Sequence, residues 1–154
     1  MRRLRLTLNE EKTHLCRVPV EYFDFLGCTF GRYYSHRTGR AYLGTRPSKK
    51  SVKRLIGKIR EQTDRKTFLL DADEMVDRLN RMLGGWANYF CLGPVSKAYN
   101  TVDRYSNRRL RRWLCSKHKV DSGGYTRFSA EYLYSTLGLV NLPELTSSFP
   151  WAKT

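Results

Sequence analysis

Arginines at helical spacing are the residues of this sequence best suited to binding a charged partner. Arg104, Arg108, Arg111 and Arg112 are four, three and one residues apart, so a helix gathers their guanidinium groups on one face. A guanidinium holds phosphate with a planar fork of donors and also stacks on bases. From Arg104 to Lys119 the only charges are positive, whereas a solvated helical face commonly mixes Lys with Glu. The pattern favours phosphate binding over a simply solvated face.

Positive charge is concentrated in two blocks of the chain. The 154 residues carry 29 Lys and Arg against 14 Asp and Glu, a net charge of +15. Residues 46–70 hold nine bases and two acids, residues 95–119 hold eight and one, and residues 71–94 are slightly acidic. Such an imbalance makes a domain repel itself, which favours a polyanionic partner, nucleic acid before an anionic membrane surface. The candidate nucleic-acid-binding residues are Lys49, Lys50, Lys53, Arg54, Arg104, Arg108, Arg109, Arg111, Arg112, Lys117 and Lys119.

Aromatic side chains are a second feature of the sequence, at 13% of the residues. Several tyrosines could stack on bases, although core packing accounts better for most of them. These tyrosines are Tyr33, Tyr34, Tyr89, Tyr99 and Tyr105. The aromatic residues expected in the core, because they lie on apolar stripes, are Trp86, Phe90 and Trp113.

The sequence lacks the common signatures of a self-sufficient enzyme. It has no Walker loop, no H-E-x-x-H and no G-x-S-x-G. The four cysteines form no C-x2-C pair, and Cys115 with His118 is half of a metal site at best. No stretch approaches the roughly 18 apolar residues of a membrane span, and the basic N-terminus lacks the apolar core of a secretory signal. We expect a cytoplasmic binding domain with no membrane segment and no metal site of its own.

The candidate residues need a scaffold, which the apolar periodicity predicts. Residues 22–45 have the aromatic and β-branched content of two strands around a polar turn at 35–40, which predicts a β-hairpin. Ser48 is a suitable N-cap for a helix that follows. The apolar stripe of that helix, with spacing i, i+3, i+4 and i+7, consists of Val52, Leu55, Ile56 and Ile59.

Two longer helices are predicted next. One starts at Asp71 or Asp73, with acids in its first turn as the helix dipole prefers. The glycine pair at 84–85 interrupts its apolar stripe, which suggests a close backbone approach or a bend. The other runs from about residue 95 to residue 117. A short fourth helix over 130–137, capped by Ser129, is predicted after a loop, and residues 141–154 are expected to be extended.

Several short motifs, in order along the chain, resemble one known family. Residues 8–13 are similar to the L-N-x-x-K-T block and residues 25–30 to the F-L-G-x-x-F block at the end of a reverse transcriptase palm. Residues 81–90 resemble the G-W-x-N-Y-F core of the maturase-specific domain, and R-L-R-R-W-L with K-H-K at 109–119 resembles its next helix. Residues 149–153 also match. The chain thus resembles the C-terminal part of reverse transcriptases encoded by group II introns, also called maturases.

The resemblance implies a fold and a function. It implies an α+β, mainly α chain with a palm remnant over residues 1–45, a helical thumb of three main helices over 46–125, and a short helix with a tail over 126–154. Such proteins bind their intron RNA, support its folding and splicing, and grip the RNA–DNA template–primer duplex during reverse transcription. By resemblance Lys12 would lie near the phosphates of an incoming nucleotide. The primer grip would consist of Phe25, Leu26 and Gly27.

Departures from the family limit these expectations. The polymerase site of the family needs a Y-A-D-D motif whose aspartates hold two magnesium ions, and this sequence has none. The fingers, most of the palm and the H-N-H endonuclease segment of some members are also absent. The chain therefore resembles the C-terminal third of a larger protein, whose palm would hold the magnesium. It is expected to bind RNA and not to polymerise alone.

Three alternatives stay open at this point. The chain could be a working polymerase subunit that a separate fingers–palm chain completes. It could be a DNA-binding module whose third helix enters a major groove. It could also be the end of a reverse-transcriptase-like protein that serves defence or CRISPR adaptation.

Overall fold

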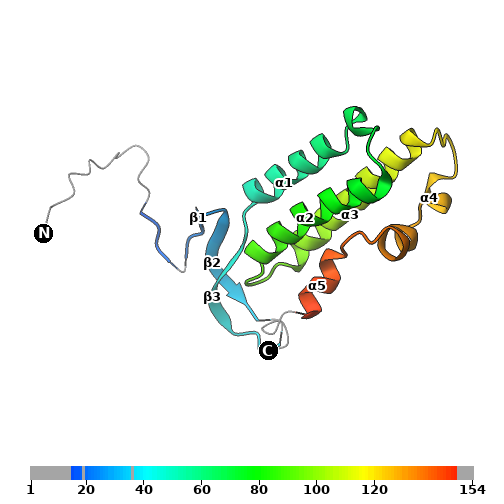
Figure 1. Ribbon diagram of the computed structural model, residues 1–154. Coiled ribbons are helices and arrows are strands. Elements are labelled where there is room, and N and C mark those ends of the chain that lie inside the picture. The colour runs from blue at the N-terminus through cyan, green and yellow to red at the C-terminus, as the bar shows by residue number, and fades with distance from the viewer. Residues whose placement is uncertain (1–14, 19, 36, 149–154) are drawn as a thin grey trace, which may run out of the picture.

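The computed structural model of the chain describes residues 15–18, 20–35 and 37–148, which form a small antiparallel sheet followed by a helical body (Figure 1). The strands, in sheet order, are β1 (Phe23–Phe25), β2 (Cys28–Tyr34) and β3 (Ala41–Pro47). The helices are α1 (Lys49–Gln62), α2 (Ala72–Tyr89), α3 (Ser96–Lys117), α4 (Gly124–Arg127) and α5 (Leu142–Ser148), with a 3-10 turn η2 (Arg65–Thr67) and a π-helical turn η3 (Tyr132–Thr136). The predicted α+β, mainly helical fold class is confirmed.

The sheet differs from the predicted single hairpin. The first predicted strand is broken by a two-residue turn, so that Phe25 pairs with Cys28 and β1 runs back along β2. Leu26 and Gly27 form this turn with φ values of 49° and 80°. Such turns match the twist of the strands, but the left-handed conformation strains a leucine and not a glycine. β2 and β3 then form the expected hairpin, which gives three strands in place of two.

Helix α1 begins where the sequence predicts. The Ser48 hydroxyl accepts a backbone N–H of the first turn at 3.1 Å, as an N-cap does. Only part of its predicted apolar stripe reaches the core. Leu55 and Ile59 are buried, whereas Val52 and Ile56 are only half-buried. One edge of the stripe therefore remains open to solvent.

Helix α2 is continuous through its glycine pair, and the close backbone approach predicted there is wrong. The helix follows Asp71 and passes through Gly84 and Gly85 without a break. A Cβ added at either glycine would meet nothing within 4 Å, so no close helix crossing requires them. Burial of Leu79 and Leu83 on the same helix compensates for the low helix propensity of the glycines.

The core lies around α3, which packs against α1, α4 and α5. Figure 1 shows α1, α2 and α3 side by side, with the sheet at one end of this bundle. Trp113 and Phe90 are buried as predicted, whereas Trp86 is only half-buried. Tyr99 is completely buried, and its hydroxyl donates to the Ala87 carbonyl of α2 at 2.8 Å.

The C-terminal segment is helical where it was predicted to be extended. Residues 142–148 form α5, and the buried side chain of Leu142 anchors it against α3. The predicted fourth helix is present, although it takes π-helical form over η3. The Ser129 hydroxyl caps it by accepting the Tyr132 N–H at 3.1 Å. Asn80 of α2 binds the connection to α5 by donating to the Gly138 carbonyl and accepting from the Val140 N–H, both at 2.8 Å. The closing motif at 149–153 lies outside the described residues.

Candidate nucleic-acid interface

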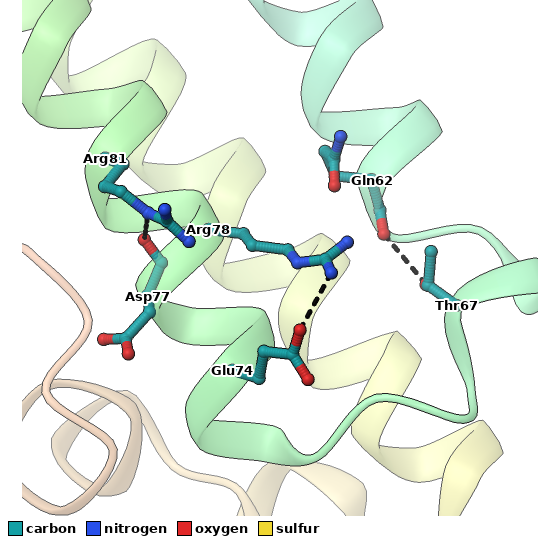
Figure 2. Close-up of polar contacts among 6 residues, drawn as sticks. All are labelled: Gln62, Thr67, Glu74, Asp77, Arg78 and Arg81. Atoms are coloured by element: carbon teal, nitrogen blue, oxygen red, sulfur yellow. Dashed lines mark hydrogen bonds and ion pairs between the residues drawn. The ribbon is translucent and has the colours of Figure 1, made fainter.

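The cations of α1 and α3 have no carboxylate partners among the residues that the structure describes. One ion pair forms in that part of the chain, between Arg78 and Glu74 on α2, with the two atoms 2.8 Å apart. Figure 2 shows this pair beside Arg81, whose Nε donates to the Asp77 carbonyl of the same helix at 3.4 Å. The positive charge of α1 and α3 is therefore not neutralised by ion pairs within the described residues.

A groove runs along the contact between α1 and α3, and we call it the α1–α3 groove. Three hollows succeed one another along it, from the end of β3 to the loop after α1. Among its described lining residues Asp64 is the one acid. Its cationic lining residues are Arg46, Lys49, Lys53, Arg60, Arg65, Lys97, Arg108, Arg109 and Arg112.

A second groove, which we call the α1–α2 groove, lies on the other side of α1. It has a volume of about 760 Å³, which is within the range of ligand-binding clefts, about 300–1,000 Å³. Lys50, Arg54 and Lys58 of α1 line one wall. Trp86 and Tyr89 of α2 lie on the other wall, and the Trp86 ring N–H donates to a serine hydroxyl of α1 at 3.3 Å. This groove combines phosphate-binding cations with aromatic surface.

The residues predicted for the primer grip lie at one end of the α1–α2 groove. Leu26 and Gly27 line the groove, whereas Phe25 is exposed beside it. The turn is tied to the helical body because the Gly27 carbonyl accepts the Ser48 N–H at 2.8 Å and the Leu26 carbonyl accepts the Tyr89 hydroxyl at 3.1 Å. Lys12, which the resemblance places near the phosphates of an incoming nucleotide, lies outside the described residues.

Some predicted RNA-binding residues are exposed and project from the two basic helices. On α1, Lys49 and Lys53 line the α1–α3 groove, whereas Lys50 and Arg54 line the α1–α2 groove. The exposed members on or after α3 are Arg104, Arg108, Arg112 and Lys119. Arg108 lies with its guanidinium carbon 5.3 Å from the Tyr105 ring centre, which holds it over the groove.

Three other predicted residues make hydrogen bonds within the chain. Arg109 donates to the Thr63 hydroxyl at 2.9 Å and to the Thr63 carbonyl at 2.8 Å, and so caps the end of α1. Arg111 donates to the Phe128 carbonyl at 2.6 Å, and its guanidinium lies 4.3 Å from the Tyr125 ring centre. The guanidinium N–H groups of Arg109 and Arg111 are therefore partly occupied by hydrogen bonds that join α3 to neighbouring segments.

Lys117 is the third of these residues. Its ammonium group donates to the Phe68 carbonyl at 2.9 Å and to the Leu70 carbonyl, and it lies 5.3 Å from the Trp113 ring centre. These bonds fasten the end of α3 to the segment between α1 and α2.

Several groove cations were not among the predicted residues. Arg46, Arg60 and Lys97 line the α1–α3 groove, and Lys58 lines the α1–α2 groove. The charge count of residues 46–70 pointed to three of them. Lys97 precedes Arg104 by seven residues and therefore lies on the same face of α3, a spacing that could have identified it.

A buried polar cluster lies away from both grooves, between α3, η3 and α5. The Asp103 carboxylate accepts the Tyr134 hydroxyl at 2.6 Å, the Asn107 side-chain amide at 3.1 Å and the Leu142 N–H at 3.3 Å. Burial raises the pKa of the Asp103 carboxyl above its usual value, although the bond from Tyr134 opposes this. Burial and the bond to Asp103 raise the pKa of Tyr134 to about 12, so its hydroxyl remains a donor at neutral pH. The cluster joins the C-terminal segment to the bundle.

Neither a metal-ligand cluster nor a membrane-spanning helix occurs in residues 15–18, 20–35 and 37–148. No three His, Cys, Asp or Glu side chains gather there into a group that could hold a metal ion. Within the same residues no helix has the length and apolar character needed to cross a membrane.

Comparison with known proteins adds one match. The sequence model of the family described as "Group II intron, maturase-specific domain" matches residues 52–132, which is more than half of the chain. No curated protein matches the chain. The matched segment begins within α1 and ends at the start of η3, so it contains α2, α3 and most of both grooves.

Proposed function

Because the chain belongs to the group II intron maturase-specific domain family, we propose that it binds the structured RNA of such an intron through the cations of its two grooves. The family membership supports a maturase role in intron splicing. Binding would hold the RNA in its folded form, which is how a protein without catalytic groups can assist splicing. The proposal assigns the chain binding and not catalysis.

The observation that carries this proposal is the charge of the grooves. Phosphates in RNA are closely spaced, and each cation that contacts one releases a condensed counterion. The cations of α1 and α3 line two grooves on either side of one helix, and no described carboxylate pairs with them. Folded RNA is read mainly by its shape, backbone and unpaired bases, which suits grooves that mix cations with aromatic rings.

The finer roles of the family are part of the same proposal. The chain would be the thumb of a longer reverse transcriptase, and the turn at Leu26 and Gly27 would contact the primer strand of a template–primer duplex. The fingers and palm of that protein would hold the magnesium, and the protein would act in the cytoplasm. The position of this turn at one end of the α1–α2 groove supports a continuous path for nucleic acid.

The test is a salt-titrated filter-binding assay. It compares a group II intron RNA, a scrambled RNA of equal length and a DNA duplex. If about six phosphates are contacted, affinity for intron RNA falls by about three decades between about 50 and 200 mM salt. Substituting Arg60, Arg108 and Arg112, which line the α1–α3 groove, by Gln should weaken binding and make the salt slope shallower by about one for each lost contact.

The matched control removes the same charge elsewhere. Arg17, Arg37 and Arg40 are exposed and lie before the helical body, so their replacement by Gln leaves both grooves intact. Equal losses in the two triple variants would contradict the assignment to the grooves. Equal affinity for all three nucleic acids would reduce the chain to a nonspecific polycation, and preference for the duplex DNA would favour a DNA-binding module.

A further inference from the structure

The first hollow of the α1–α3 groove differs from the rest of the groove because its floor is apolar. It lies between the end of β3, the first half of α1 and the start of α3, and has a volume of about 460 Å³. Val52 and Ile56 of α1 and Ala98 of α3 form the floor. We call this hollow the β3 pocket.

The β3 pocket exists because the facing helices do not fill it. Val52 and Ile56 belong to the apolar stripe of α1 and are only half-buried. The residue that α3 places opposite them is Ala98, whose single methyl group leaves the space open. Apolar surface that remains uncovered in a folded domain commonly marks a binding site.

All the described charged residues that line the β3 pocket are cations, and they form its rim. Arg46, Lys49, Lys53 and Lys97 surround the apolar floor, all four are exposed, and no described lining residue is acidic. This arrangement matches a ligand with a flat apolar body and negative charges on both sides.

One wall of the pocket is an aromatic ring held in a fixed position. The Tyr33 hydroxyl donates to the Thr29 carbonyl at 3.2 Å, and its ring meets the Tyr22 ring edge-on with the ring centres 5.9 Å apart. The Arg46 guanidinium lies 5.6 Å from the Tyr33 ring centre. A fixed ring with a cation over it is a surface for a base and its phosphate that needs little ordering on binding.

We propose that the β3 pocket takes one unpaired nucleobase of the bound RNA, with its flanking phosphates held by the rim cations. The inference rests on the proposed RNA binding and specifies that the β3 pocket favours RNA with an unpaired base. Bases of loops and bulges can leave the helical stack and pack on aromatic side chains, whereas paired bases cannot. An apolar side chain of a protein partner would fit the floor but would leave four cations unmatched, so the charge favours RNA.

The test compares two RNA stems that differ at one position. One stem carries a single bulged 2-aminopurine, a fluorescent base, and the other carries an abasic site in the same bulge. The wild-type chain should bind the first about ten-fold more tightly, since stacking of one base contributes about that factor. The fluorescence of the bulged base should also change on binding, because its surroundings change from water to the Tyr33 ring.

Filling the pocket should remove this preference. The variant is Ala98→Phe, which occupies the floor without altering charge, and the control is Asn100→Phe, at an exposed position of the same helix. The ratio of the two affinities should fall to about one in Ala98→Phe and stay at about ten-fold in Asn100→Phe. Lys49→Gln with Lys53→Gln should weaken binding of both stems while preserving the ratio.

Each other outcome is decisive. Equal affinity of the wild-type chain for both stems, with a steep salt dependence, overturns the pocket proposal and leaves the proposed RNA binding intact. An unchanged ratio in Ala98→Phe also overturns the proposal. Absence of binding to either stem and to intron RNA overturns the proposed function itself.

Discussion

Arg108 and Arg109 are neighbours on α3 but have different surroundings. Arg108 is exposed and lies over the Tyr105 ring at the edge of the α1–α3 groove. Arg109 turns toward the end of α1, where it donates to the hydroxyl and the carbonyl of Thr63. The helical rotation of 100° per residue separates the two roles. The sequence alone presents them as equivalent.

Replacing these two arginines should therefore affect different quantities. Arg109→Gln removes charge-assisted bonds that satisfy the last carbonyls of α1, and should lower the free energy of unfolding by about 1–3 kcal/mol. Arg108→Gln should lower it by less than about 0.5 kcal/mol, as exposed substitutions do. Urea titration followed by circular dichroism measures both values, and equal losses would show that the bonds of Arg109 do not stabilise the fold.

The buried carboxyl of Asp103 predicts a pH dependence of stability. Burial raises its pKa in the folded chain above the ordinary value of 3.8. The folded state then binds the proton more tightly than the unfolded state, so the free energy of unfolding falls as the pH rises through the interval between the two pKa values. Asp103→Asn, which does not titrate, should lack this fall.

Urea titrations at a series of pH values upward from 3.8 test this prediction. The wild-type chain should lose stability relative to Asp103→Asn over that interval. A gain would mean that the three donors around the carboxylate lower its pKa more than burial raises it. The comparison with Asp103→Asn cancels the titration of all other groups, provided that both chains unfold in one step.

At the scale of elements, strong apolar periodicity allowed correct prediction of α1, α2 and α3. The stripes of these helices are long enough that single unfavourable residues, such as the glycine pair in α2, do not outweigh the burial. The break between β1 and β2 was missed because Leu26 adopts a conformation that leucine rarely takes. The α5 helix was missed because residues 141–154 contain two prolines, although Pro143 lies in the first turn of the helix, where proline removes no helical hydrogen bond.

The site was predictable to the level of elements and not of single side chains. The excess of Lys and Arg in residues 46–70 and 95–119 predicted the two basic helices, because charge density can be counted directly in the sequence. Whether Lys117 faces solvent or the Phe68 carbonyl depends on a contact between residues that are 49 positions apart in the sequence. No local sequence pattern contains this information. The β3 pocket depends likewise on Ala98 lying opposite α1.

The connection between α2 and α3 predicts a contrast between two glycines. Gly93 has a φ of 80°, and a Cβ there would lie 1.9 Å from the Thr45 carbonyl oxygen of β3. Gly93→Ala should therefore lower the free energy of unfolding by about 2 kcal/mol or more, because backbone atoms of the sheet must move.

Gly84→Ala is the matched substitution within a helix. A Cβ at this position meets no atom within 4 Å, so alanine should raise the free energy of unfolding by about 0.5–1 kcal/mol. Thermal melts of the two variants should therefore shift in opposite directions. A stable Gly93→Ala chain would mean that β3 and the α2–α3 connection are not held in contact in solution.

At the scale of the whole molecule, the sheet and the helical body differ in burial. The core residues belong almost entirely to the helices and to the segment from Phe128 to Leu142, whereas β1 and β3 expose most of their side chains. The sheet is held to the bundle by few bonds, such as the one between the Tyr89 hydroxyl and the Leu26 carbonyl. Regions with little buried apolar surface open at low free-energy cost.

Hydrogen exchange of the full chain should show this difference directly. Amide protons of α2 and α3 should exchange only on global unfolding, whereas those of β2 and β3 should exchange at least about ten-fold faster. Mass spectrometry of peptides resolves the two regions. Equal protection would mean that the sheet and the bundle unfold as one unit.

The position of α1 between two grooves limits which sequence changes this helix can tolerate. Lys49 and Lys53 face one groove, Lys50 and Arg54 face the other, and Leu55 faces the core. Insertion of a single residue would rotate everything after it by about 100° and exchange these assignments. During evolution this helix should therefore tolerate substitutions between Lys and Arg more readily than any insertion or deletion.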